Sequence, residues 1–216
     1  MSDLGTMKTR IASEILRADW ADSYVASAIT DAIDDYSATR FRFNAARFRL
    51  NTVSGQEFYT LPDALLSDTG SALSSGEDVI EIDAVNVRFN GAAFVLTPVT
   101  DGWSESFTTT TTTGQPQYYS WTGQKIRFTP IPDQVYEVRI VGLKKLLTLA
   151  TNAASNGWTT DGAALIRARA KVRLYRDILR NADMAAAAQA EELSALTALT
   201  RAANAQQSGR LQAWGY

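Results

Sequence analysis

The chain has 216 residues, a formal net charge of −2, and neither histidine nor cysteine. Without these two residue types it has no disulfides, no thiolate metal sites, no cysteine nucleophile, and none of the side chains most used for proton transfer near neutral pH. Hydrophobic residues at 45% and charged residues at 20% are globular proportions, and the acidic balance argues against a dedicated nucleic-acid binder.

Apolar residues at helical spacing predict two helices at the start of the chain. The first is expected at Met7–Arg17, and Asp22 or Ser23 offers the N-cap of the second. No basic stretch precedes an apolar core at the N-terminus, and no apolar run approaches the roughly 20 residues that span a bilayer. We therefore expect no secretory signal, no membrane span, and synthesis in a cytoplasm.

The hydrophobic period changes to two from Arg47 onward, which predicts a β-rich segment. The long strand Val79–Phe89 changes its apolar phase midway, and a β-bulge near Asp83 would explain the change. Asn90-Gly91 is a strong hairpin signal, and a second hairpin is expected at Thr122-Gly123.

Two segments between the strands are expected to be exposed loops. Residues Pro62–Asp78 are rich in Ser, Gly and Asp, and Thr108–Thr113 shows no alternation of apolar and polar residues. A later strand alternates again, with Tyr136, Val138 and Ile140 on one face.

Helices are predicted once more after residue 160, with Asp161 as the N-cap of the first. An alanine-rich helix is expected at Met184–Gln207, and Ser208-Gly209 ends it. The first of these helices carries a narrow apolar seam whose members lie three and four residues apart: Leu165, Ala168, Val172, Tyr175 and Leu179.

Together these segments predict an α+β fold. Helices from both chain ends are expected to form one helical layer, with an inserted antiparallel β-rich domain and an extended C-terminal tail. The expected parts are the N-terminal helices at 1–45, the β-rich insertion at 46–149, the C-terminal helices at 150–208, and a docking tail at 209–216.

The two helical ends carry opposite charges, which predicts that they meet within a subunit or between subunits. Exposed pairs of this kind contribute only about 0.2–1 kcal/mol each, so charge would set register more than stability. A basic stripe beside the apolar seam fits either a solvated flank with intramolecular ion pairs or a contact to a neighbouring subunit, and DNA binding comes third. The stripe is Arg169, Arg173, Arg176 and Arg180, and the opposing acidic residues are Glu14, Asp19, Asp22, Asp31, Asp34 and Asp35.

No catalytic residue, cofactor or metal site is predicted. Glu77, Asp78, Glu81 and Asp83 are expected to point outward at the start of a strand, although such carboxylates could serve glycoside hydrolysis. The aspartates near residue 34 lack the oxygen spacing of a calcium loop, and no glycine-rich phosphate loop is present.

The C-terminal tail ends in large side chains, Leu211, Trp214 and Tyr216. Termini usually fray, so a disordered end is one interpretation. Large aromatic residues are enriched at interface hot spots, and we favour a tail that docks in a groove of a partner protein.

Three combinations of aromatic, glycine and proline residues follow one another along the chain. They are Arg40–Asn44 with Thr52–Pro62, then Gly114–Tyr119 with Ile126–Pro132, and finally Ser155–Trp158 with Leu165–Ala170 and Leu174-Tyr175. In this order they resemble the head-to-tail connector (adaptor) proteins of tailed bacteriophages, and the resemblance covers nearly the whole chain.

The resemblance implies a structural virion protein at the head–tail junction, made in the bacterial host cytoplasm, and not an enzyme. Family members form a homo-oligomeric ring, typically of twelve copies, beneath the portal protein ring, and a downstream tail or nozzle protein follows. Helices surround the channel, through which packaged DNA passes without specific binding. C-terminal extensions commonly dock onto the portal, which would give Leu211, Trp214 and Tyr216 that role.

Two alternatives from other functional classes remain open on the sequence. A carbohydrate- or cell-surface-binding module would use Tyr118, Tyr119 and Trp121 as a stacking platform. A glycan hydrolase would use Glu81 and Asp83 as its carboxylate pair.

Overall fold

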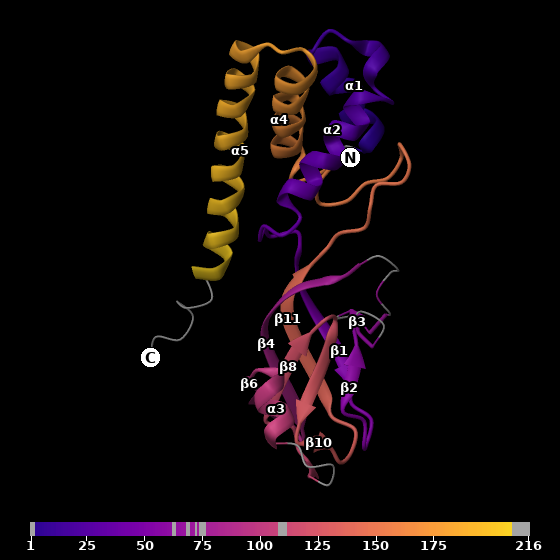
Figure 1. Ribbon diagram of the computed structural model, residues 1–216, viewed down its shortest axis with the longest axis vertical. Helices are drawn as coiled ribbons and strands as arrows, with labels where there is room; N and C mark the ends of the chain where they lie inside the picture. The colour runs from indigo at the N-terminus through magenta and orange to yellow at the C-terminus, as the bar shows by residue number, and fades with distance from the viewer. Residues whose placement is uncertain are drawn as a thin grey trace. The chain divides into compact units, whose positions relative to one another are not determined.

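The computed structural model describes residues 3–61, 64–67, 70–71, 73, 77–107 and 112–208. The chain divides into two compact units, Met1–Asn44 with Leu146–Tyr216 and Ala45–Lys145. We call the first the helical unit and the second the β unit. The helices and antiparallel sheets of Figure 1 confirm the predicted α+β class.

The helical unit contains helices from both ends of the chain. Among the described residues, no helix is long and apolar enough to cross a membrane. The helices are α1 (Leu4–Glu14), the 3-10 turn η1 (Ala18–Trp20), α2 (Tyr24–Tyr36), α4 (Ala163–Arg173) with its π-helical continuation η2 (Leu174–Ile178), and α5 (Ala182–Ser208).

Helix α1 begins and ends earlier than the hydrophobic pattern predicted. The Asp3 carboxylate caps it by accepting a hydrogen bond from the Thr6 N–H at 2.7 Å. Leu16 ends it in the left-handed region, at φ 57°. The N–H of Arg17 then donates to the Ala12 carbonyl at 2.8 Å, which is the long hydrogen bond of a Schellman cap.

The expected cap of α4 is wrong. Gly162 lies at the N-cap position and makes no side-chain hydrogen bond there. The Asp161 carboxylate instead pairs with Arg42, at 2.8 Å. Ser23 does occupy the N-cap of α2, but its hydroxyl donates to the Trp20 carbonyl at 3.4 Å instead of capping the helix.

One hydrophobic core joins α1, α2, α4, η2 and α5. Leu165, Val172 and Tyr175 of the predicted seam lie in it, and Leu179 packs against it while only partly buried. Ala168, the remaining seam residue, is buried as well. Phe43 and Trp158 add an aromatic contact, with ring centroids 4.9 Å apart. Gly157 permits this contact, because a Cβ there would lie 2.5 Å from the Phe43 ring. Burial of this core is the main source of the unit's stability.

The β unit contains a five-stranded antiparallel sheet in the order β3-β1-β11-β4-β5. Asp83 is the extra residue of a β-bulge in β4, because Ala84 pairs with Val141 while Ile82 pairs with the next residue, Gly142. The predicted bulge is therefore confirmed. The strands are β1 (Ala45–Asn51), β3 (Leu66–Ser67), β4 (Val79–Phe89), β5 (Ala92–Val95) and β11 (Glu137–Lys144).

A four-stranded sheet in the order β2-β9-β8-β6 completes the core of the β unit. Phe48 and Val138 from the first sheet share one buried cluster with Tyr59 and Phe128 from the second. The strands are β2 (Phe58–Thr60), β6 (Thr97–Pro98), β8 (Tyr118–Thr122) and β9 (Lys125–Thr129), and a separate parallel pair is formed by β7 (Thr113–Gly114) and β10 (Ile131–Pro132).

Both expected hairpins are present. Asn90 and Gly91 have φ of 48° and 80° and join β4 to β5, the signature of a type I′ turn. The second turn lies one residue later than predicted, at Gly123-Gln124. A short helix, α3 (Asp101–Phe107), was not predicted, and the last residue of the threonine run lies in strand β7 instead of a loop.

Candidate functional site

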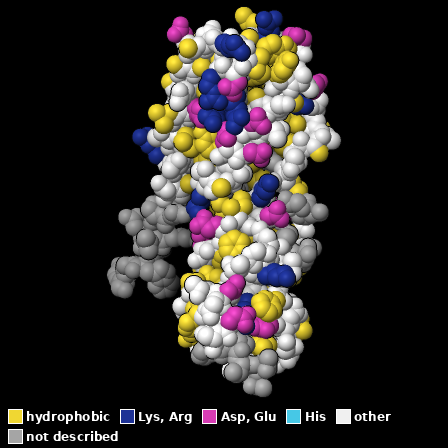
Figure 2. Space-filling view, viewed as in Figure 1, with side chains coloured by type: hydrophobic (Ala, Val, Ile, Leu, Met, Phe, Trp, Pro, Cys, Tyr) yellow, Lys and Arg dark blue, Asp and Glu magenta, His cyan; other side chains and the backbone are white. Residues whose placement is uncertain are grey.

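Helix α4 is the electrostatic centre of the helical unit. Figure 1 shows α4 between α5 on one side and α1 with α2 on the other. Its basic residues point to both sides, so it can pair with carboxylates from each neighbour. Figure 2 shows dark-blue basic side chains bordered by magenta acidic ones over this unit.

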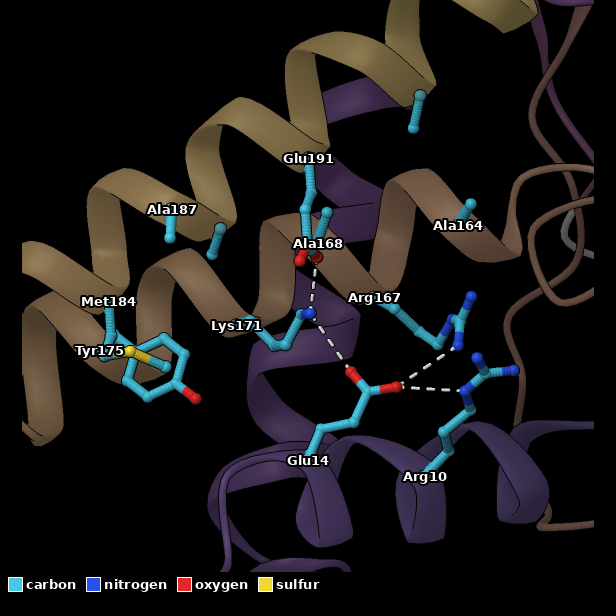
Figure 3. A pocket seen from close by; sticks show the side chains of 12 residues that line it. Arg10, Glu14, Ala164, Arg167, Ala168, Lys171, Tyr175, Met184, Ala187 and Glu191 are labelled. Carbon is cyan, nitrogen blue, oxygen red and sulfur yellow. Dashed lines mark hydrogen bonds and ion pairs between the residues drawn. The ribbon is translucent and has the colours of Figure 1, made fainter.

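One cluster lies in a groove between α1, α4 and α5, with a volume of about 480 Å³ (Figure 3). The Glu14 carboxylate accepts a hydrogen bond from Arg10 at 3.0 Å and lies 3.5 Å from an Arg167 nitrogen. The Lys171 ammonium bridges Glu14, at 3.1 Å, and Glu191, at 2.6 Å. These contacts connect all three helices through one chain of charges.

The protonation of this cluster is fixed by its own contacts. Burial disfavours the charged Glu14, but hydrogen bonds from Lys171 and Arg10 outweigh it and lower the pKa of the carboxyl group. Burial likewise opposes the charged Lys171, but hydrogen bonds to Glu191 and Glu14 raise the pKa of its ammonium. Both groups therefore stay charged near neutral pH, which suits a structural clamp and not an acid–base catalyst.

A second cluster joins α2 to α4. The Asp35 carboxylate accepts hydrogen bonds from Arg169 at 2.7 Å and from Arg173 at 2.8 Å. Arg173 also reaches Asp31, at 3.2 Å. Burial disfavours the charged Asp35, but hydrogen bonds from Arg173 and Arg169 lower the pKa of its carboxyl group.

Glu192 extends the second cluster to α5 and is 7% exposed. It accepts a hydrogen bond from the Tyr36 hydroxyl and lies 3.5 Å from Arg169. Burial and the hydrogen bond to Glu192 both raise the pKa of the Tyr36 hydroxyl. Glu192 was not predicted from the sequence; its place on the same side of α5 as Ala188 and Leu196 was the signal that could have revealed it.

The four arginines of the predicted stripe do not share one environment. Arg169 and Arg173 both pair with Asp35 of the same chain. For these two arginines, this agrees with the interpretation of the stripe as a flank with intramolecular ion pairs. Arg176 pairs with its neighbour Asp177 at 2.7 Å, and both are exposed. Arg180 is exposed in the turn before α5, at φ 50°. A contact of the stripe with a neighbouring subunit stays a prediction.

The exposed hydrophobic side chains of the helical unit lie on both sides of α4. On α5, Leu193 is 66% exposed and Met184 is 45% exposed. Beyond α1, Leu16 is 89% exposed in its left-handed turn, a conformation that disfavours a branched side chain. The exposure of these residues was not predicted, because a helical pattern does not show which apolar residue of a helix lies outside the core.

Other predicted residues are placed differently or lie outside the described part of the chain. Leu211, Trp214, Tyr216 and most of the threonine run lie outside the described residues. The aromatic residues of strand β8 alternate between its two faces: Tyr119 and Trp121 pack in the core, while the Tyr118 ring lies tilted against Trp103, with ring centroids 4.8 Å apart. Tyr118, Tyr119 and Trp121, the stacking platform of the alternative carbohydrate-binding module, therefore do not share one exposed face.

The carboxylates considered for catalysis belong to the β unit. Glu81 and Asp83 are exposed on β4, and Asp83 is the bulge residue. Glu77 pairs with Lys144. Among the residues that the structure describes, no group of three or more acidic, His or Cys side chains could hold a metal ion.

Comparison with known proteins gives one family. The model of a family described as SU10 adaptor protein matches residues 2–213, nearly the whole chain and both units. No curated protein matches the chain.

Proposed function

The chain belongs to the SU10 adaptor protein family, a family of phage structural proteins, and we propose that it joins the portal of the capsid to the tail. In this role it is a virion protein that forms a ring beneath the portal and continues the DNA channel. The observation that carries the proposal is the family match over residues 2–213. A ring of twelve copies follows from the resemblance to head-to-tail connectors.

The helical unit supports a role in assembly. Its charged clusters hold α1, α2, α4 and α5 together, so the unit can present a fixed surface. A closed ring needs a head-to-tail interface in which two different surfaces meet. We assign the exposed side of α5, with Leu193, to one surface, and the turn at Leu16 to the other. Arg176 and Arg180 are the basic residues placed to add a charged contact between copies.

The tail residues are proposed to bind the portal. Leu211, Trp214 and Tyr216 follow α5 and combine three large apolar side chains in six residues. One weak contact per copy gains strength around a ring, because neighbouring copies hold each tail at a high effective concentration. The formal net charge of −2 suits a channel through which DNA must slide without being held.

Light scattering with the purified cognate portal tests this proposal. The full-length chain should add to the portal, and a chain truncated after Ser208 should not. A chain with Trp214→Ala and Tyr216→Ala serves as a full-length control. If neither form adds to the portal, the adaptor proposal is wrong; if both add equally, only the role of the tail is wrong.

A further inference from the structure

The edge strand β5 has an unusual composition. It lies at one end of the five-stranded sheet and consists of Ala92–Val95, all exposed. Phe94 is 44% exposed and Val95 is 75% exposed. An edge strand of this kind presents unpaired backbone groups beside hydrophobic side chains, which invites another strand to pair.

The other edges of the two larger sheets are better protected. Strand β3 has only two residues, β6 has two and includes Pro98, and β2 has three. Short length and proline are the common means by which proteins prevent unwanted strand pairing. Strand β5 is the longest of these edges and the one made entirely of hydrophobic residues.

The hairpin register shows which backbone groups of β5 face outward. Ala92 pairs with Phe89 across a two-residue turn, so this pair exchanges hydrogen bonds. Hydrogen-bonded and non-hydrogen-bonded residue pairs alternate along an antiparallel ladder. The Leu96 N–H donates to the Val85 carbonyl at 2.8 Å, as expected if every second residue of β5, starting from Ala92, bonds to β4. The N–H and C=O groups of Ala93 and Val95 therefore point away from β4, toward the edge. This edge ends two residues beyond Val95, where the Thr97 N–H donates to the Gln117 carbonyl at 3.0 Å.

The two faces of this edge differ in chemistry. Phe94 lies on the core side, next to a groove of about 380 Å³ that Leu96, Gln117 and Tyr118 also line. On the opposite face, Ala93 lies directly across from Arg88, which is exposed. Because Ala93 is small, the long Arg88 side chain can extend across it to the next position beyond the edge.

Among the described residues of β1, β4 and β11, the outer face of the sheet places Arg49, Arg88 and Arg139 close to one carboxylate, that of Glu137. Arg49 lies opposite Arg139 in the register, and Arg88 lies opposite Glu137. Like charges placed directly opposite are destabilising. Glu137 pairs with Arg139 at 2.7 Å, and the hydrogen bond from Arg139, with the charges of Arg49 and Arg88, lowers the pKa of its carboxyl group. An acidic group of a partner placed next to the exposed Arg88 would complement its charge.

We propose that β5 is a docking site for an extended segment of another protein, which adds as a sixth strand. The segment would have hydrophobic residues on the face toward Phe94 and acidic residues on the face toward Arg88. The backbone of Ala93 and Val95 supplies the hydrogen bonds to the segment. The alternation of hydrophobic and acidic residues in the segment supplies the specificity.

This site does not depend on the proposed role at the portal. It lies in the β unit, whereas the contacts proposed for ring formation and portal binding lie in the helical unit. If the protein is the adaptor proposed above, the segment belongs to the component that follows it in the tail. Loss of strand docking with normal portal binding would separate the two proposals.

The test uses the isotope-labelled full-length protein and a synthetic peptide that alternates valine with glutamate. Binding should shift the amide signals of Ala93 and Val95 and slow their hydrogen exchange. Ala93→Pro should lower the affinity of the protein for this peptide about tenfold or more. The fold should survive, because this N–H makes no bond to β4; circular dichroism checks this. Arg88→Glu leaves the backbone intact. It should lower the affinity for the valine–glutamate peptide and raise the affinity for a peptide that alternates valine with lysine.

Arg47→Glu is the matched control, since Arg47 is exposed on β1 of the same sheet. It should leave the affinity within about twofold. Absence of binding, or binding that Ala93→Pro and Arg88→Glu both leave unchanged, would overturn the proposal. Self-association that Ala93→Pro abolishes would also overturn it, because the occupant of the edge would then be a second copy of this chain.

Discussion

The helical unit and the β unit use their arginines in different ways. In the helical unit, Arg169 and Arg173 are paired with carboxylates of a neighbouring helix. On the outer face of the five-stranded sheet, Arg49 lies opposite Arg139. The helical unit thus uses much of its charge to hold itself together and exposes hydrophobic side chains. On the outer face of its five-stranded sheet, the β unit instead gathers Arg49, Arg88 and Arg139 around the Glu137 carboxylate.

One arginine of the β unit breaks this pattern and carries the largest expected effect. Arg127 is 4% exposed and pairs with Glu57 and, at 2.7 Å, with Glu105. Arg127→Ala should lower the free energy of unfolding by about 3 kcal/mol, because a buried side chain is removed and the Glu57 carboxylate, with its side chain 24% exposed, is left without its partner. Urea unfolding measures this.

Glu105→Gln is the control for this prediction, since the Glu105 side chain is 68% exposed. It should cost at most about 1 kcal/mol. Equal losses in the two variants would show that Arg127 is no buried clamp.

Each unit contains a glycine that is closely packed, Gly142 in the β unit and Gly157 in the helical unit. A Cβ on Gly142 would lie 2.1 Å from the Glu81 carbonyl oxygen, beside the bulge, whereas one on Gly157 would meet the Phe43 side chain. A backbone atom cannot move aside as a ring can. Gly142→Ala should therefore cost about 1–3 kcal/mol or more, and Gly157→Ala should cost less.

Thermal unfolding compares these variants with Gly114→Ala, whose new Cβ would meet nothing within 4 Å. That control should unfold like the parent chain. A smaller loss for Gly142→Ala than for Gly157→Ala would contradict the bulge geometry.

The next effect tests the charge clamp of the helical unit. Asp35→Ala removes the shared partner of Arg169 and Arg173 and should cost about 1–2 kcal/mol, since all three side chains are partly exposed. Asp177→Ala removes only the exposed pair with Arg176 and should stay within about 0.5 kcal/mol. Chemical unfolding would refute the clamp if the two variants lost the same stability.

Acidification should weaken the same clamps. Glu14 and Asp35 have carboxyl pKa values lowered in the folded state. Their contribution is therefore complete above the unfolded-state values, near pH 4, and is lost as the pH falls through the folded-state values. The double variant Glu14→Gln, Asp35→Asn should lose less stability between pH 6 and pH 3 than the parent chain. Urea unfolding at several pH values measures this. The prediction is contradicted if the free energy of unfolding falls by the same amount in the parent chain and in the double variant.

The smallest effect on stability concerns the exposed side of α5. Leu193→Lys should change the free energy of unfolding by at most about 0.5 kcal/mol, because the side chain is 66% exposed. It should nevertheless reduce assembly on the portal, measured by light scattering. Normal assembly would remove Leu193 from the proposed ring interface.

Local patterns predicted much of the fold. Period-two alternation predicted the buried residues Tyr136, Val138 and Ile140, and a phase change predicted the bulge at Asp83. The turn Asn90-Gly91 followed from the need for positive φ. These features depend on a few neighbouring residues, so one sequence is sufficient to reveal them.

Features decided by tertiary contacts were harder to predict. Asp161 looks like a helix cap locally, but Arg42 is a better partner for it in the folded chain. Helix α3, seven residues long, is too short for a helical period to be recognised. The pairing of Asp35 with Arg169 links residues more than a hundred positions apart, so charge patterns indicated the attraction but not its partners.

Native mass spectrometry of the portal mixed with excess chain is the most direct test of the proposal that this protein builds a ring on the portal. We expect portal rings that are either empty or fully occupied, with twelve copies added, because each bound copy offers its Leu193 or Leu16 surface to the next. Portal rings that gain no mass would show that the protein is not a portal adaptor. A random distribution of partly filled rings, unchanged by Leu193→Lys, would contradict the proposed contact between copies.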